Sequence, residues 1–266
     1  MKSEKTWTPE ERAGELSAPV ASNKRPRLSE AASGIWDRLD AEAELEWFID
    51  VRIAKALVIL PIAGGFVVLA TRLYPPLFHL LVNEDRFLQW LQFLGYLTAS
   101  IAAVLISFRL HREKRLLLSI AFALLAAGCF FVAGEEISWG QRILGFGTPH
   151  EWAEINRQHE TNIHNVDEVP FNLTMMLIGA YGSVGAWFVR WRLRGRTPEI
   201  LEFLFPPLFL TTSFFVLFGY KFLRFTFFTT PHMTVVRMGE WAELCLALAL
   251  AAFTLLTRRR MRLKEG

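Results

Sequence analysis

The stretch LLLSIAFALLAAGCFFVAGEEISWGQR, residues 116–142, places nearly twenty mostly apolar residues in front of two adjacent carboxylates, Glu135 and Glu136. A helix needs about 20 apolar residues to cross the hydrocarbon core of a bilayer, so the first part of the stretch predicts a membrane-spanning helix. A charged side chain at bilayer depth costs at least ~2.5–3.5 kcal/mol on insertion scales. Two glutamates at the end of such a helix therefore indicate a polar site near one membrane surface.

Five further apolar runs are also long enough to cross a bilayer. Hydrophobic residues make up 52% of the 266-residue chain, and they gather in blocks where a soluble domain would alternate them with polar residues. The expected fold class is an all-α integral membrane protein with six transmembrane helices. In chain order, the spans are expected at residues 54–72, 87–108, 116–134 and 171–189, between 200 and 228, and at 239–257.

Lysine and arginine are distributed unevenly over the connections between these spans. The segments RLHREKR (109–115) and RWRLRGR (190–196) carry four basic residues each, and the C-terminal RRRMRLKEG (258–266) carries five. The connections on the opposite side carry only two or three each. Because basic residues accumulate on the cytoplasmic side of a membrane, both termini are expected in the cytoplasm and the GEEISWGQR segment on the outer side.

The rest of the chain is expected to form two tails, an interfacial helix and one structured loop. The first residues are polar and lack apolar periodicity, which is typical of a flexible tail. Trp36, Leu39 and Trp47 then recur at helical spacing, which predicts an amphipathic helix lying on the membrane surface or packing on the bundle. The expected parts are a cytoplasmic tail (1–34), an amphipathic interfacial helix (35–52), a six-helix membrane domain (53–257) with a structured outer loop (135–170), and a basic cytoplasmic tail (258–266).

Several classes of function lack their sequence signatures. The net charge of +3 comes from short basic clusters beside apolar blocks, which indicates membrane topology and argues against a nucleic-acid partner. Cys129 and Cys245 both lie in apolar runs, which argues against a disulfide framework or a cysteine metal site. The chain has no GxSxG elbow, P-loop, HExxH or dinucleotide-binding fingerprint. Membrane lipid is the expected partner, and the sequence identifies no protein partner.

The residues that follow the third span predict a short extension of that helix. On a continuing helix, Glu135, Ser138 and Trp139 share one face with Arg142. The extension is expected to break at GFGTP, where Thr148 would cap the start of a new short helix.

A crowded polar segment, HETNIHN (159–165), follows in the same connection. One helical turn could direct its imidazole and carboxylate groups at a single point, and both groups are suitable ligands for zinc or another divalent ion. The candidate metal ligands are His159, Glu160 and His164, and the candidate cofactor is a divalent metal. The alternative is that these polar residues form a solvated loop.

Adjacent acids at a boundary between water and lipid suit general acid–base chemistry. The candidate catalytic residues are Glu135 and Glu136, with His164 as a metal ligand or proton carrier. Basic residues on the outer side could hold an anionic group such as a lipid phosphate. Candidate substrate-binding residues are Trp139, Gln141, Arg142, Asn162, Asn165, Lys221, Arg224, Arg237, Glu240 and Glu243. Alternatively, these acids and bases form ion pairs that only fix helix packing.

Three functional hypotheses follow from this pattern. The first is a membrane-embedded enzyme, a hydrolase or transferase, acting on a lipid or lipid-linked substrate from a polar pocket in the outer leaflet. The second is a non-catalytic scaffold or partner protein in which the charges are structural. The third is a small carrier of a cation or proton, against which the lack of an internal repeat argues. The sequence does not decide whether the protein is an enzyme.

The segment GEEISWGQRILGFGTP and a downstream N-x-Q-x-E-x-N-x-H-N pattern resemble a group of uncharacterised bacterial multi-pass membrane proteins. The resemblance implies a bacterial integral membrane protein and brings no activity with it. The expected location is the bacterial inner membrane. A looser similarity, to alkaline-ceramidase-like membrane hydrolases with a zinc site, assigns no residue. Those proteins carry closely spaced paired histidines late in the chain, where this sequence has only His232. The residues of the downstream pattern are Asn156, Gln158, Glu160, Asn162, His164 and Asn165.

Overall fold

The computed structural model of the protein describes residues 34–83, 87–156, 160–163, 166, 171–193, 198–227 and 232–263. Over these ranges the chain forms helices and no strand. Six helical segments are long and apolar enough to cross a membrane. The expected fold class is therefore confirmed, and the chain is an all-α multi-pass membrane protein.

Each expected span corresponds to one helix or to a set of consecutive helices. The first is α4 (Val51–Ala70), extended by η2 (Thr71–Leu73), and the second joins α5 (Pro75–Val82) to α6 (Phe87–Arg112). The third is α7 (Leu116–Glu136), and the fourth runs through α10 (Phe171–Ala180), the π-helical η4 (Tyr181–Gly185) and α11 (Ala186–Leu193). The last two are α12 (Glu199–Leu204), η5 (Leu208–Leu210) and α13 (Thr211–Thr226), followed by α14 (Met233–Leu263).

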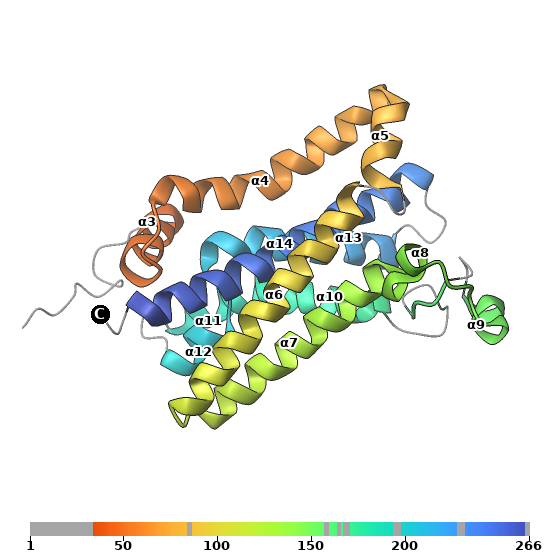
Figure 1. Ribbon diagram of the computed structural model, residues 1–266. Helices are drawn as coiled ribbons and strands as arrows, with labels where there is room; N and C mark the ends of the chain where they lie inside the picture. Colours follow the sequence, from red (N-terminus) through yellow and green to blue (C-terminus); the bar gives the residue numbers. More distant parts are fainter. Residues whose placement is uncertain are drawn as a thin grey trace, which may run out of the picture.

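The short helices lie at the two ends of the bundle (Figure 1). At one end, called here the α9 end, are α8 (Gln141–Leu144) and α9 (His150–Ile155), beyond the last residue of α7. At the other end, the C-terminal end, the N-terminal helix α3 (Ile35–Ala41) and the π-helical η1 (Glu42–Glu46) lie near the end of α14. Helices α6 and α13 cross between the two ends.

Helix α6 packs between α7 and α14 and presents small or polar residues to both neighbours. An added Cβ at Gly95 would lie 3.0 Å from the Cβ of Ala247, so glycine lets α6 approach α14 closely. On the α7 side, Ser100 donates a hydrogen bond to the carbonyl of Ala126 at 2.9 Å. Small residues and hydroxyl bonds of this kind are a common way to join helices in lipid, where apolar burial drives association weakly.

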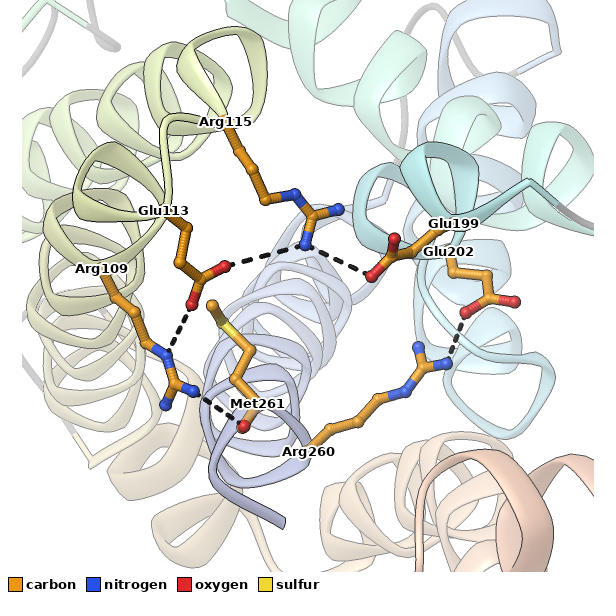
Figure 2. A network of polar contacts seen from close by, with 7 residues as sticks. All are labelled: Arg109, Glu113, Arg115, Glu199, Glu202, Arg260 and Met261. Atoms are coloured by element: carbon orange, nitrogen blue, oxygen red, sulfur yellow. Dashed lines mark hydrogen bonds and ion pairs between the residues drawn. The ribbon is translucent and has the colours of Figure 1, made fainter. Parts of the chain in front are cut away.

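At the C-terminal end, a network of charged side chains links α6, α7, α12 and α14 (Figure 2). Arg109 bonds Glu113 at 3.0 Å and the carbonyl of Met261 at 2.9 Å. Arg115 lies 3.9 Å from Glu113 and 3.3 Å from Glu199, so it bridges α7 to α12. The remaining pair of the network joins α14 to α12 and consists of Arg260 and Glu202.

The N-terminal segment docks onto this same end by a buried ion pair and a buried indole. Glu42 accepts hydrogen bonds from Arg190 at 2.6 Å and from the backbone N–H of Leu208 at 2.8 Å. Trp47 is 1% exposed, packs against Phe209 and lies under the Arg260 guanidinium at 5.1 Å. Of the two placements expected for this helix, the structure therefore shows packing on the bundle. The tail expected at 1–34 lies outside the described residues, apart from residue 34.

We expect Glu46 in η1 to make stability depend on pH. Burial, with repulsion from Glu42 and Glu202, raises the pKa of its carboxyl from 4.5 to about 7, against the opposing charges of Arg260 and Arg190. The folded state thus holds this proton more tightly than the unfolded chain. The stabilisation is complete below pH 4.5 and is lost as pH rises through about 7. Thermal unfolding in detergent should show this slope in the wild type and a flatter one in Glu46→Gln. Equal slopes would contradict the assignment.

We expect Glu42→Ala to destabilise the protein by about 3–5 kcal/mol, because it leaves the Arg190 charge unpaired in a buried position. The matched control is Glu113→Ala at the same end, where the carboxylate side chain is 35% exposed and the loss should be about 0–1 kcal/mol. Denaturant unfolding in detergent micelles measures both. Equal losses in the two variants would show that η1 is not anchored by Glu42.

Candidate functional site

The chain turns sharply directly after the two adjacent glutamates, so α7 does not continue as the sequence predicted. The break predicted at GFGTP is present, because the separate helical turn α8 ends at Leu144. Helix α7 ends at Glu136, and Ser138, Trp139 and Gly140 all have positive φ values, of 48°, 56° and 78°. Only Gly140 adopts this left-handed region without steric cost. Ser138 and Trp139 are non-glycine residues in this left-handed region, which is sterically unfavourable for them. Contacts with the surrounding residues must therefore stabilise the turn.

The contacts that hold this turn begin at Glu135. Its carboxylate accepts a hydrogen bond from the indole N–H of Trp139 at 2.7 Å and another from the backbone N–H of Ile163 at 2.5 Å. The Trp139 ring folds back over Gly134, where an added Cβ would lie 2.8 Å from ring carbons. Glu135, 1% exposed, thus fastens the turn and the polar segment around residue 163 to the end of α7.

A second set of buried bonds joins the turn to the polar segment. Ser138 donates to the Glu160 carboxylate at 2.6 Å, and Asn162 donates to the same carboxylate at 2.8 Å and to the Ser138 hydroxyl at 3.0 Å. Asn156 donates to the carbonyl and side-chain oxygens of Asn162 at 2.7 and 2.8 Å. All four side chains are at least nine-tenths buried, so this network fixes the loop.

Gln141 adds a third attachment within the loop. Its side chain donates to Thr148 Oγ1 at 2.6 Å and accepts from the backbone N–H and hydroxyl of Thr161 at 2.9 and 2.6 Å. Thr148 is therefore not the helix cap that the sequence predicted. Pro149 occupies the N-cap position, and α9 begins at His150.

Glu136 points to a different set of partners, between the helices. It is 7% exposed, makes a side-chain hydrogen bond with Gln89, and lies close enough to interact electrostatically with Glu240, Glu243 and Lys221. Among the residues that the structure describes, Glu136 forms no ion pair of its own. The two adjacent glutamates thus have separate environments, one in the loop and one in the bundle.

The other charged groups of this inter-helix cluster are held by direct bonds. Lys221 of α13 lies 2.6 Å from a Glu243 oxygen and donates to Asn172 of α10 at 2.8 Å. Gln92 of α6 donates to the backbone carbonyl and the carboxylate of Glu240 at 2.8 and 3.0 Å. The cluster therefore joins α6, α7, α10, α13 and α14 at the α9 end.

Two arginines lie between this cluster and the α9 end. Arg224 is three residues from Lys221 along α13, and Arg237 is three residues from Glu240 along α14, which places each about 4.5 Å nearer that end. Arg224 makes a side-chain hydrogen bond with Tyr220, and both arginines are half-buried.

Helix α6 contributes polar side chains to the cluster that were not predicted as site residues. Gln89 bonds Glu136, Gln92 bonds Glu240, and the Tyr96 hydroxyl lies near the charges of Glu136 and Glu243. Polar residues at positions 89, 92 and 96 share one face in the first, mostly apolar turns of α6. That spacing was a usable signal, since polar groups inside a span mark functional or pairing positions.

Three predicted site residues, and the side chain of a fourth, fall outside the part of the chain that the structure describes. His159, His164 and Asn165 lie outside the described residues, and so does the side chain of Arg142. Within the described ranges, no group of three or more His, Cys, Asp or Glu residues is arranged to hold a metal ion. Glu160 is bound by Ser138 and Asn162, and its expected role as a metal ligand with the two histidines stays a prediction.

Comparison with known protein families, with curated proteins and with solved structures gave no match.

We expect Gly140→Ala to destabilise the loop by about 1–2 kcal/mol, because an added Cβ is strained at a φ of 78°. The matched control is Gly128→Ala on the exposed face of α7, where no atom lies within 4 Å of the added Cβ. There, alanine should stabilise the helix by about 0.5–1 kcal/mol. Hydrogen exchange of residues 137–141 and 160–163 measures the loop, and unchanged exchange in Gly140→Ala would contradict the imposed turn.

Proposed function

We propose that this protein is a membrane-embedded enzyme that acts on a lipid or lipid-linked substrate, with Glu136 as its acid–base group. The observation that carries the proposal is a buried carboxylate with a neutral hydrogen-bond partner, Gln89, and no ion pair of its own among the described residues. Ionisable side chains at membrane depth are costly, so they are retained mainly where they pair or react. Glu243 and Lys221 pair with each other, whereas Glu136 is left for proton transfer.

The depth of the cluster supports a substrate that is a lipid. Glu136 is the last residue of its span, and Glu240 and Lys221 lie within three turns of the ends of α14 and α13. Carriers usually bind their ions near the bilayer midplane, at the interface of repeated halves. Reactive groups near one end of the spans instead lie where the headgroup and ester region of a lipid begins. Arg224 and Arg237, nearer that end than Lys221 and Glu240 along their own helices, would hold an anionic headgroup.

The loop network has a supporting role in this proposal. Glu135 accepts bonds from Trp139 and Ile163, so its oxygens hold the turn and we assign it a positioning role. Rigid support of this kind keeps a reacting group within reach of its target. The partly exposed Trp139 and Gln141 would border the substrate, and the buried Asn162 would support them from within the loop.

The same proposal places the protein in a bacterial inner membrane with both termini in the cytoplasm. The C-terminal end of the bundle gathers the connections richest in lysine and arginine, which is the cytoplasmic arrangement. The cluster around Glu136 then faces the outer leaflet.

One observation favours a structural role as the second candidate. Glu243 with Lys221, and Glu240 with Gln92, form short bonds across helices that would stabilise packing without any chemistry. In that case the cluster is a scaffold that fixes α6, α13 and α14, and Glu136 is one more member of it.

The test is turnover of a bacterial membrane lipid extract by the detergent-purified protein, followed by mass spectrometry of all lipid classes. We expect the wild type to convert one class and Glu136→Gln to lose at least about a hundredfold in rate, the range for an acid–base group. Glu199→Gln, at the opposite end of the bundle, is the matched control and should keep full activity. A folded Glu136→Gln protein with wild-type turnover, or no turnover by the wild type, would reject the proposal.

A further inference from the structure

The deepest polar groups of the cluster are two oxygens on one face of α6. Gln92 is 0% exposed and Tyr96 is 1% exposed, and neither the Gln92 Oε1 atom nor the Tyr96 hydroxyl has a hydrogen-bond partner among the residues that the structure describes. The two residues are four apart, so their side chains meet on the same face of the helix. Leaving one buried polar atom without a hydrogen bond costs about 1–3 kcal/mol of folding free energy. Two such atoms on one helix face therefore indicate a bound molecule that forms hydrogen bonds with both.

The hydrogen-bonding capacities of the two atoms are complementary. The Gln92 amide nitrogen donates to two Glu240 oxygens, which fixes the orientation of the amide and leaves Oε1 as an acceptor. The Tyr96 hydroxyl can donate, and it lies near the Glu136 and Glu243 carboxylates. One water molecule can accept from Tyr96, donate to Gln92 and donate its second proton to Glu136, which is the usual number of bonds for a buried water. A metal cation would leave the Tyr96 hydroxyl proton without an acceptor.

We propose that Tyr96 and Gln92 hold the reacting water of a hydrolase, whose substrate is the acyl ester of an anionic phospholipid. This inference rests on the proposed function of Glu136 and specifies its reaction. Glu136 removes a proton from the water as its oxygen bonds to the ester carbonyl carbon. The bond from that carbon to the glycerol oxygen then breaks, and Glu136 returns the proton to the glycerol oxygen. The products are a fatty acid and a lysophospholipid.

The order of groups along the helix axes matches the order of groups in such a lipid. Along α13 and α14, Arg224 and Arg237 lie nearer the α9 end than Lys221 and Glu240, and along α6 Tyr96 lies about 6 Å deeper than Gln92. In a phospholipid, the phosphate is outermost and the acyl ester is one glycerol unit deeper. A phosphate on the arginines would therefore bring the ester carbonyl towards Glu136 and the water.

The water site can be tested directly by radiolytic hydroxyl labelling of the full protein in detergent, because radicals formed from a bound water oxidise the side chains beside it. We expect Tyr96 to be labelled several-fold more than Phe122, which is 2% exposed and lies among apolar side chains. Gln92→Leu should lower the labelling of Tyr96. Labelling of Tyr96 as weak as that of Phe122 would overturn the water site.

The reaction can be tested in ¹⁸O-labelled water with phosphatidylglycerol vesicles and the purified protein. We expect one ¹⁸O atom in each fatty acid released. Tyr96→Phe should slow release by on the order of tenfold, the effect of one hydrogen bond. Ser100→Ala removes a hydroxyl from α6 one turn deeper and should leave the rate unchanged.

The outcomes separate this inference from the proposed function. Turnover of lipid extract without ¹⁸O in the products would make the protein a transferase, which overturns the hydrolytic water and leaves the acid–base role of Glu136 standing. No turnover of any lipid class would reject both. Tyr96→Phe at the wild-type rate, with ¹⁸O still incorporated, would overturn the role of Tyr96 in holding the water.

Discussion

A carboxylate buried between helices in a bilayer has to find its partners on neighbouring helices, because lipid offers none. This constraint shapes the α9 end of the bundle. Lys221 reaches Glu243 and Asn172, and Gln92 reaches Glu240, so α6, α10, α13 and α14 are tied together by polar bonds around a common point. Glu136 of α7 lies beside the same groups, but its hydrogen-bond partner is the neutral Gln89. It therefore differs from Glu243, whose partner is the charged Lys221.

The two adjacent glutamates show how one helix end serves two purposes. Successive residues on a helix point about 100° apart, so Glu135 and Glu136 face different surroundings. Glu135 turns to the loop, where Trp139 and Ile163 hold its carboxylate, and Glu136 turns to the bundle. The left-handed turn at Ser138 and Trp139 brings the loop back over the end of α7. The loop network thus holds the end of the helix that carries Glu136.

Run lengths and residue spacing were enough to predict the six spans and the polar character of the α9 end. The turn after Glu136 was not predictable, because only Gly140 of its three left-handed residues has a sequence preference for that conformation. Pairs of residues far apart in the sequence were not predictable either, because spacing along one helix says nothing about contacts between helices. Gln92 and Glu240 are 148 residues apart, as are Glu42 and Arg190. The second of these pairs also decides that the N-terminal helix packs on the bundle, which its amphipathic pattern left open.

The most direct test of Glu136 as the reactive group is a high-resolution structure of the protein in nanodiscs made from bacterial phospholipids. The expected result is one lipid with its phosphate on Arg224 or Arg237 and an ester carbonyl facing Glu136. A bundle in which no lipid reaches the cluster and Glu136 is ion-paired with a basic residue would contradict it, and the acids and bases would then be a packing scaffold.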